Sequence, residues 1–271
     1  LKHRGGGGEE GNKDGNTDLM IASCKGNLYD VQTLLANHAD VNATNNDNKT
    51  ALMFASEYGH LSCIRALLNN GAEVNAEDKH GWRALMYASY GGHVICDSCV
   101  TALLEVGAVV NAKTKKGNTA LILASANDRD SIVRVLLANG AEVNTKDKYD
   151  STALMHASAR GYKSIVQALL RAGADKDAKD QYGSTALIWA SAIGQESIVR
   201  DLLKAGVDME AKDKYGSTAL MYASKNGHKS CVRALLDAGA SDSYLKEKEL
   251  REAAGRGDEE TVKFWLNKGA D

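Results

Sequence analysis

Short apolar segments alternate with polar ones along most of the chain, and the alternation has a fixed length. The segment STALMHAS at 151–158 returns as STALIWAS at 184–191 and as STALMYAS at 217–224. A second apolar stretch follows each of these segments, with apolar pairs one turn apart, such as Ile132–Val133 and Leu136–Leu137. Both stretches have helical spacing, so the pattern predicts pairs of short helices that recur along the chain.

The repeat length is read from the residue that precedes each first helix. Two runs of positions keep a step of 33 residues: Thr17, Thr50 and Arg83, then Thr119, Thr152, Thr185 and Thr218. Only the step from Arg83 to Thr119 is longer, at 36 residues. A fixed period of this size predicts stacked supersecondary units that contact their neighbours, not a single compact core.

Local signals mark the helix ends in these units. Threonine is a good N-cap, because its hydroxyl accepts an N–H of the first turn. A glycine closes the first helix at Gly59, Gly92, Gly161, Gly194 and Gly227. Another ends the second helix in the left-handed conformation, at Gly71, Gly107, Gly140, Gly173, Gly206 and Gly239. A polar segment follows, such as ADKDAKDQYGS at 174–184, with Asp-x-x-Gly turn chemistry.

One unit shows the full motif, with DKYGSTALMYA at 213–223, GH at 227–228 and LLDAGA at 235–240. GAEVN recurs at 71–75 and 140–144. This pattern is similar to the ankyrin repeat signature, DxxGxTPLHxA, then GH, then LLxxGAxVN, although Ala and Met or Ile replace its Pro and His. The resemblance implies an all-α repeat solenoid. Its helix-turn-helix repeats, joined by hairpin-like turns, would form a curved stack with a concave groove.

The match covers about residues 16–271 and defines three parts of the chain. Residues 1–15 form a Gly-rich segment that we expect to be a flexible tail. Seven repeats fill residues 16–243, the third with a three-residue insertion at 94–96. The more charged segment 244–271 is either an atypical capping repeat or the start of a further array. Because it stops within the motif, we expect the chain to be a fragment of a longer protein.

Composition narrows the class of partner and the compartment. The net charge is -2, which gives no general attraction to nucleic acid or to an anionic membrane. The turn lysines are also interleaved with aspartates. No apolar run is long enough for a transmembrane helix, so we expect no nucleic-acid partner and no membrane insertion. The five scattered cysteines favour a reducing compartment, which predicts the cytoplasm, with the nucleus as the alternative.

The stretch GGHVICDSC at 91–99 looks most like a metal or redox site. However, Cys63, Cys99 and Cys231 share an apolar slot of the second helix that other repeats fill with Ile, and cysteine packs there as a small hydrophobe. The insertion places Cys96 three residues before Cys99. A zinc ion would also need a fourth ligand. We therefore expect an extra helical turn or bulge here, with no metal ion and no cofactor.

No catalytic constellation survives alignment of the repeats, which predicts a protein without enzymatic activity. The leading hypothesis is a monomeric scaffold or adaptor that binds a partner protein through the concave face. The alternative is a regulatory region of a larger enzyme or membrane protein. A weaker hypothesis is modification, because the resemblance makes three turn asparagines candidates for hydroxylation: Asn42, Asn75 and Asn144.

The resemblance also implies where a partner would bind, at the turn tips and at the ends of the first helices. The matching turn residues are Lys79, His80, Trp82, Lys115, Lys148, Tyr149, Gln181, Tyr182, Lys214 and Tyr215. The matching helix-end residues are Tyr90, Arg160 and Asn226. Exposed Tyr, Trp and Arg dominate interface energetics, although recent duplication could equally explain the tyrosines. One first-helix slot is expected to be mainly core: Phe54, Tyr87, Leu123, His156, Trp189 and Tyr222.

Overall fold

The computed structural model describes residues 14–91, 96–256 and 259. Within these residues the regular elements are α-helices, and no strand is formed beyond an isolated bridge between Lys146 and Thr152. The predicted all-α repeat architecture is therefore confirmed. The chain divides into two compact units, which we call unit 1 (Leu1–Glu142) and unit 2 (Val143–Asp271).

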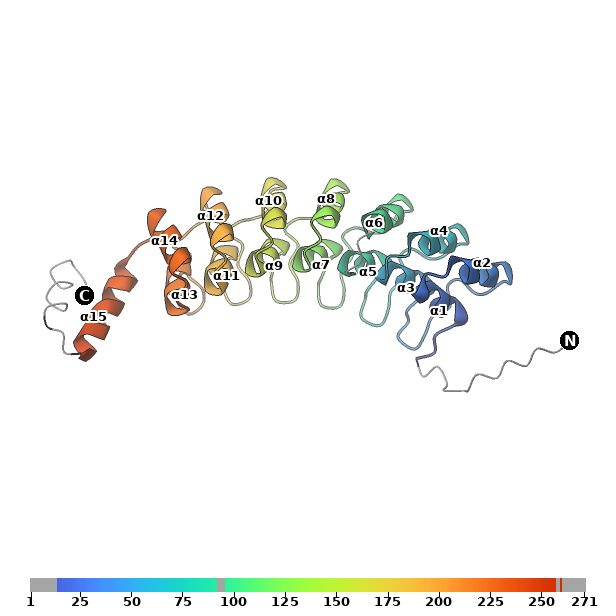
Figure 1. Cartoon of the computed structure of the whole chain (residues 1–271), viewed down its shortest axis with the longest axis horizontal. Helices are drawn as coiled ribbons and strands as arrows, with labels where there is room; N and C mark the ends of the chain where they lie inside the picture. The colour runs from blue at the N-terminus through green and yellow to red at the C-terminus, as the bar shows by residue number, and fades with distance from the viewer. Residues whose placement is uncertain (1–13, 92–95, 257–258, 260–271) are drawn as a thin grey trace. The chain divides into compact units, whose positions relative to one another are not determined.

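The helices, labelled in Figure 1, form pairs in each unit, and α15 follows the last pair of unit 2. Unit 1 contains α1 (Asp18–Lys25), α2 (Leu28–Ala36), α3 (Ala51–Glu57), α4 (Leu61–Asn69), α5 (Ala84–Tyr90), α6 (Cys96–Glu105), α7 (Ala120–Ala126) and α8 (Asp130–Ala138). Unit 2 contains α9 (Ala153–Arg160), α10 (Lys163–Arg171), α11 (Ala186–Ile193), α12 (Glu196–Lys204), α13 (Ala219–Lys225), α14 (Lys229–Asp237) and α15 (Ser243–Arg256).

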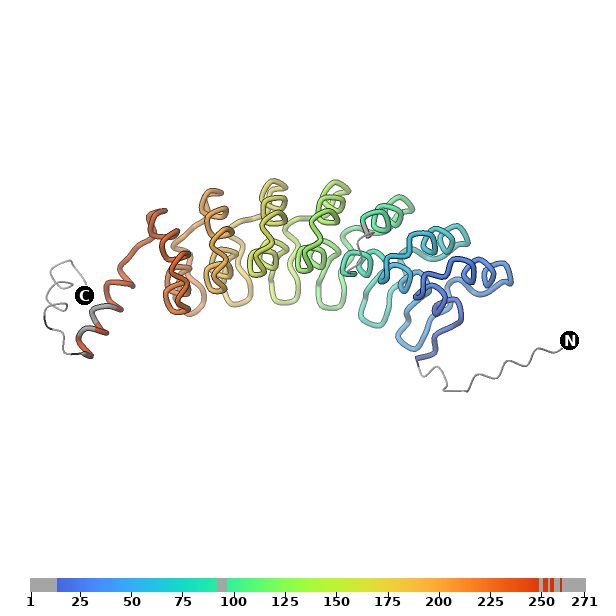
Figure 2. The backbone as a smooth tube through the Cα atoms, in the orientation of Figure 1, coloured from blue at the N-terminus to red at the C-terminus, as the bar shows by residue number. Residues whose placement is uncertain are grey.

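The helices of each unit form two layers. In unit 1 the first helices α1, α3, α5 and α7 pack side by side, and the second helices α2, α4, α6 and α8 form the other layer. In unit 2 the layers are α9, α11 and α13, and α10, α12 and α14. The turns between repeats make a row of loops beside the first helices of each unit (Figure 2).

The predicted helix caps are present at the described positions, whereas the predicted closing residue Gly92 lies outside the described residues. Six first helices begin after a threonine whose hydroxyl accepts the N–H three residues on, as from Thr185 to Ile188 at 3.3 Å. Arg83 replaces this threonine before α5 and makes no such bond. The six glycines predicted to end the second helices all have positive φ. His38 stands at the same position of the first repeat with φ 62°, a conformation that costs a non-glycine residue free energy.

Small and aliphatic side chains fill the space between helix pairs. In unit 2, Ala157, Ile165, Val166 and Leu169 are fully buried or nearly so, and unit 1 buries the equivalent positions. The predicted cysteine slot is also buried, since Cys63, Cys99 and Cys231 are at most 1% exposed. Burial raises the pKa of the Cys63 and Cys231 thiols, which keeps them protonated and unreactive.

The predicted insertion and the C-terminal segment are described only in part. Residues 94 and 95 lie outside the described residues, and Cys96 is the first residue of α6. Helix α6 has ten residues, whereas α4 and α8 have nine. Helix α15 has fourteen and packs against α13, where Lys248 donates to the Ser224 hydroxyl at 3.3 Å. Most of the segment after α15 lies outside the described residues.

Candidate functional site

A buried aspartate organises the turn that precedes four of the first helices. Asp78, Asp147, Asp180 and Asp213 are each at most 8% exposed. Oδ1 of each accepts the backbone N–H groups two and four residues on, as Asp180 does from Tyr182 and Ser184, both at 2.8 Å. A carboxylate that accepts two N–H groups fixes a tight loop, so this aspartate sets the position of the turn tip.

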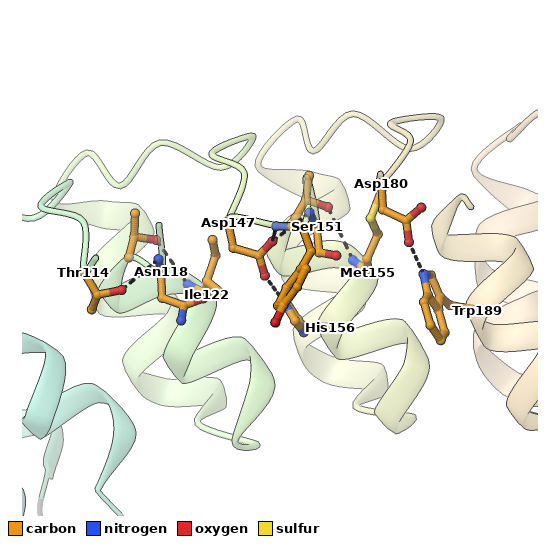
Figure 3. Close-up of polar contacts among 12 residues, drawn as sticks. Thr114, Asn118, Ile122, Asp147, Ser151, Met155, His156, Asp180 and Trp189 are labelled. Atoms are coloured by element: carbon orange, nitrogen blue, oxygen red, sulfur yellow. Dashed lines mark hydrogen bonds and ion pairs between the residues drawn. The ribbon is translucent and has the colours of Figure 1, made fainter. Parts of the chain in front are cut away.

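The second carboxylate oxygen of each aspartate accepts a bond from the first helix, nine residues further on. The Tyr87 hydroxyl donates to Asp78 at 2.6 Å, and the Trp189 indole donates to Asp180 at 3.0 Å. Nε2 of His156 lies 3.0 Å from Asp147 (Figure 3). The Tyr222 hydroxyl donates to Asp213 at 2.7 Å. These bonds tie each turn to the helix that follows it.

The first helix carries a hydrogen-bond donor at this position only in the repeats that have the turn aspartate. In the second repeat Asn45 replaces Asp, and Phe54 occupies the helix slot. In the fourth repeat Thr114 accepts the N–H groups of Lys116 and Asn118, at 3.3 and 3.1 Å, and Leu123 occupies the slot. The slot residue and the turn residue therefore change together. A buried carboxylate oxygen without a donor would cost free energy.

The hydrogen bonds change the acidity of both partners. The bond to Asp213, and then burial, raise the pKa of Tyr222 to about 12. Burial and the bond to Asp78 raise the pKa of Tyr87 still further. Burial opposes ionisation of Asp213, but the bonds from Tyr222 and from the turn backbone outweigh it and lower its pKa. The hydroxyls thus remain donors and the carboxylate remains an acceptor at neutral pH.

A pocket of about 550 Å³ opens between neighbouring repeats of unit 2. It brings together four predicted binding residues: Tyr149, Arg160, Gln181 and Tyr182. The residues that complete its lining are Ser151, Met155, His156, Ala159, Asp180 and Trp189. The Tyr149 and Tyr182 rings are about half exposed, at 48% and 49%. An apolar pocket with a few polar groups has the composition of a ligand-binding site.

Polar contacts hold the walls of this pocket in place. His156 contacts Asp147 through Nε2, and its Nδ1 lies 3.5 Å from Nη1 of Arg160. Because a guanidinium only donates, this contact assigns the lone pair to Nδ1 and the proton to Nε2. The contact with His156 therefore helps to position the Arg160 side chain, which is exposed to solvent.

The turn tips of unit 2 are also linked to one another through the backbone. The N–H of Gln181 donates to the carbonyl of Tyr149, and that of Lys214 to the carbonyl of Tyr182, both at 2.9 Å. Lys148 places its Nζ 4.5 Å from the centre of the Tyr149 ring. Tyr215, 75% exposed, and Lys214 lie on the next turn and do not line the pocket. We call these turns and α9, α11 and α13 the turn face of unit 2.

The predicted residues of unit 1 form a different arrangement. Trp82 packs against a small buried cluster of Met86, Ala112 and Leu123, so it is only partly exposed. Its ring meets Tyr90 edge to face at 5.5 Å. The remaining three residues, Lys79, His80 and Lys115, are exposed on turn tips, and the Lys115 N–H donates to the His80 carbonyl at 2.9 Å. Trp82 thus stabilises the turn as well as presenting an edge to solvent.

Comparison with known families decides what these repeats are. The sequence profile described as "Ankyrin repeats (3 copies)" matches overlapping segments that together span residues 19–271. The chain belongs to the ankyrin repeat family. A search of the curated proteins gave no match.

Solved ankyrin structures resemble the chain over most of its length. The human ASB11 ankyrin repeat domain has a TM-score of 0.75 and 27% identity, covering 83% of this chain and 99% of that one. The ankyrin repeat domain of Bcl-3, a member of the IkappaB protein family, has a TM-score of 0.67 and 32% identity. That match covers 82% of this chain and 100% of Bcl-3's. These likenesses bear out the fold expected from the sequence.

The candidate hydroxylation residues join successive ankyrin turns on the side of the second helices. Nδ2 of Asn42 donates to the Gly71 carbonyl at 3.1 Å, and Oδ1 accepts the N–H of Glu73 at 2.8 Å. Asn75 and Asn144 make the equivalent pairs of bonds in their own repeats. In unit 2, Asp177 keeps the acceptor role, and Lys176 supplies the missing donor. Hydroxylation of Asn42, Asn75 and Asn144 stays a prediction. The predicted binding residue Asn226 also has a structural role, because its side chain donates to the Ala192 carbonyl.

The histidine that follows the first-helix glycine of the ankyrin motif contacts the preceding repeat. Nε2 of His60 lies 3.0 Å from the Cys24 carbonyl, and Nε2 of His228 lies 3.1 Å from that of Ala192. The ring thus satisfies a carbonyl at the end of a helix. His93, by contrast, lies outside the described residues, and no side-chain position is described for Cys96. Among the described residues no group of three His, Cys, Asp or Glu could hold a metal ion.

Proposed function

We propose that this protein is a scaffold that binds a partner protein through its turns and first helices. Ankyrin repeats are in general protein–protein interaction modules, and ankyrin domains are typically not enzymes. The side chains that protrude from the turn tips differ between the units, with Lys79, His80 and Lys115 in unit 1 and Tyr149, Tyr182 and Tyr215 in unit 2, whereas the helix caps and glycines recur in both. A rigid scaffold with variable tips is suited to recognition.

The observation that carries this proposal is the pocket of unit 2. Its two half-exposed tyrosines stand on turns that backbone bonds and buried aspartates hold in place. Large aromatic side chains that are already ordered lose little entropy on binding. They are also the residue types that most often contribute the largest share of interface energy.

Two finer features of the proposal concern assembly and location. The scaffold acts as a monomeric array in the cytoplasm, with the nucleus as the alternative site. The free thiols Cys24, Cys63, Cys99 and Cys231 support a reducing compartment, where disulfides are rare. Within the described residues no helix is long and apolar enough to cross a membrane.

Partner capture with variants of the chain tests the proposal. The full chain is immobilised and compared with a variant carrying Trp82→Ala, Tyr149→Ala and Tyr182→Ala. The control variant carries Arg65→Ala, Arg134→Ala and Arg200→Ala, all exposed on second helices. We expect proteins captured from the native source by the wild type and the control to be lost with the first variant. Equal capture by all three proteins contradicts the assignment of the turn face.

A further inference from the structure

The turn face of unit 2 carries an unbalanced positive charge. Its exposed cationic residues are Lys146, Lys148, Arg160, Lys179, Lys212, Lys214 and Lys225. Asp147, Asp180 and Asp213 are interleaved with the lysines in sequence, but they are buried and accept bonds from the turn and the helix slot. The exposed acids of the same inter-repeat segments are Asp150 on a turn tip and, closer in sequence to the ends of α10 and α12, Asp175, Asp208 and Glu210. The lysines and aspartates therefore alternate in sequence but are separated in space, because the lysines are exposed and the three aspartates are buried.

The cations around the pocket also lack carboxylate partners. Among the described residues of unit 2, the Lys and Arg ion pairs lie on the second helices, such as Arg200 with Glu196, or in α15 and the residue before it. Lys148, Arg160 and Lys214 form none of them. Lys146 and Lys179 donate instead to the backbone carbonyls of the next turn, and keep their full charge.

The same surface of unit 1 is closer to charge balance than that of unit 2, although Lys79, Lys113, Lys115 and Lys116 are exposed on its turns. There Lys49 pairs with Glu57 at 3.2 Å, and Arg83 pairs with Glu77. Asp47 is a further exposed acid on a turn of unit 1. An acidic ligand would therefore meet a larger uncompensated positive charge on unit 2 than on unit 1.

We propose that the pocket of unit 2 binds an acidic segment of a partner protein, with one apolar side chain of that segment seated between Tyr149 and Tyr182. This inference rests on the proposed function and names the chemistry of the partner. The pocket walls of Met155, Ala159 and Trp189 receive the apolar side chain. Carboxylates on either side of it pair with Arg160 and with the rim lysines, of which Lys148 is nearest to the Tyr149 ring.

A protein segment fits this surface better than a single-stranded nucleic acid, which could also use cations and aromatic rings. Affinity for nucleic acid rests on many phosphate contacts, and the chain as a whole carries a net charge of -2. A peptide with one apolar side chain and flanking carboxylates can bind through the local excess of positive charge on the turn face of unit 2.

Fluorescence anisotropy on the full chain tests the inference with defined probes. The probe is a labelled short peptide in which a central Phe or Leu is flanked by glutamates. Matched peptides replace the glutamates with glutamines or lysines, and a labelled oligothymidylate represents nucleic acid. We expect the glutamate peptide to bind most tightly, and its affinity to fall as salt is added.

Charge reversal locates the binding site. Arg160→Glu is expected to weaken the glutamate peptide by roughly fivefold to tenfold, since it turns an attraction into a repulsion. Arg171→Glu is the matched control, because both arginines lie exposed in the last turn of a helix, α9 or α10, and both changes cost the same helix-end interaction. Binding by the control is expected to equal that of the wild type, and circular dichroism checks that both variants fold.

Each contrary outcome overturns a named part of the inference. Equal binding of the glutamine peptide removes the role of charge, and tighter binding of oligothymidylate replaces the protein segment with nucleic acid. Equal loss with Arg160→Glu and Arg171→Glu moves the site away from the pocket. If no peptide binds while partner capture still depends on Tyr149 and Tyr182, the acidic segment is wrong and the scaffold proposal stands. If capture is also independent of these tyrosines, both fall.

Discussion

The bond between the Tyr87 hydroxyl and Asp78 offers a sharp test of how turns are tied to helices. Tyr87→Phe removes one oxygen atom and leaves Oδ2 of Asp78 buried without its donor, since the two residues are 7% and 5% exposed. The ring keeps its contacts with Trp82 at 5.1 Å and with Lys49 at 4.4 Å. The expected loss of unfolding free energy is about 1.5–3 kcal/mol, the range for a hydrogen bond to a charged group.

The fourth repeat suggests a substitution of Asp78 that should abolish the effect of Tyr87→Phe on the unfolding free energy. There Thr114 accepts the turn N–H groups with a single oxygen and faces Leu123, which has no donor. In Asp78→Thr, the second carboxylate oxygen is absent, so adding Tyr87→Phe is expected to cost less than about 0.5 kcal/mol. The double-mutant cycle should therefore give a coupling energy of about 1–2.5 kcal/mol.

Urea unfolding, followed by circular dichroism and by tryptophan fluorescence, measures these differences. Tyr29→Phe is the matched control, because Tyr29 is 76% exposed in the same unit and its change should leave stability unaltered. If Tyr87→Phe costs the same with Asp or Thr at position 78, the hydroxyl–carboxylate bond does not stabilise the turn. The pairing of turn and slot residues would then have another cause.

Three further perturbations follow from the same contacts. Asn75→Ala should lose about 1–2 kcal/mol in urea unfolding, because it removes the bonds to Gly107 and Val109; no change would contradict the turn-joining role. His38→Gly should raise stability by about 1 kcal/mol, since it relieves a positive φ that the other repeats give to glycine; a loss would show that the imidazole makes a compensating contact. Tyr222→Phe should destabilise the chain at neutral pH, with a difference that shrinks as the pH falls below about 4. Because the pKa of Asp213 is lower in the folded than in the unfolded chain, its stabilising effect is complete above the unfolded pKa and is lost as the pH falls through the folded pKa. A difference independent of pH would contradict this account.

Local features of the fold could be predicted because they depend on a few adjacent residues. The threonine caps, the left-handed glycines and the period of 33 residues each have a physical cause within one repeat. The insertion is assigned to residues 94–96 because the step from Arg83 to Thr119 alone breaks the period. The three-dimensional consequence of the insertion did not follow, since it depends on how α6 packs against α4 and α8.

The candidate site was predicted only at its rim. Tyr149, Arg160, Gln181 and Tyr182 protrude from positions that the family resemblance marks, whereas Asp180 and Trp189 were missed as polar members of the pocket. A signal was present in the sequence, because a donor stands nine residues after the turn residue wherever that residue is Asp. The meaning of the lysine–aspartate alternation was not readable, because sequence spacing does not say which charges are buried.

Site-specific photocrosslinking tests the central claim most directly, namely that partners bind the turns and first helices. A photoreactive phenylalanine analogue replaces Tyr182 in one version of the full chain and Arg200, exposed on α12, in another. Irradiation in the native source should give a crosslinked protein partner at position 182 and none at position 200. A partner crosslinked only from position 200 would place the interaction on the second helices and contradict the proposed function.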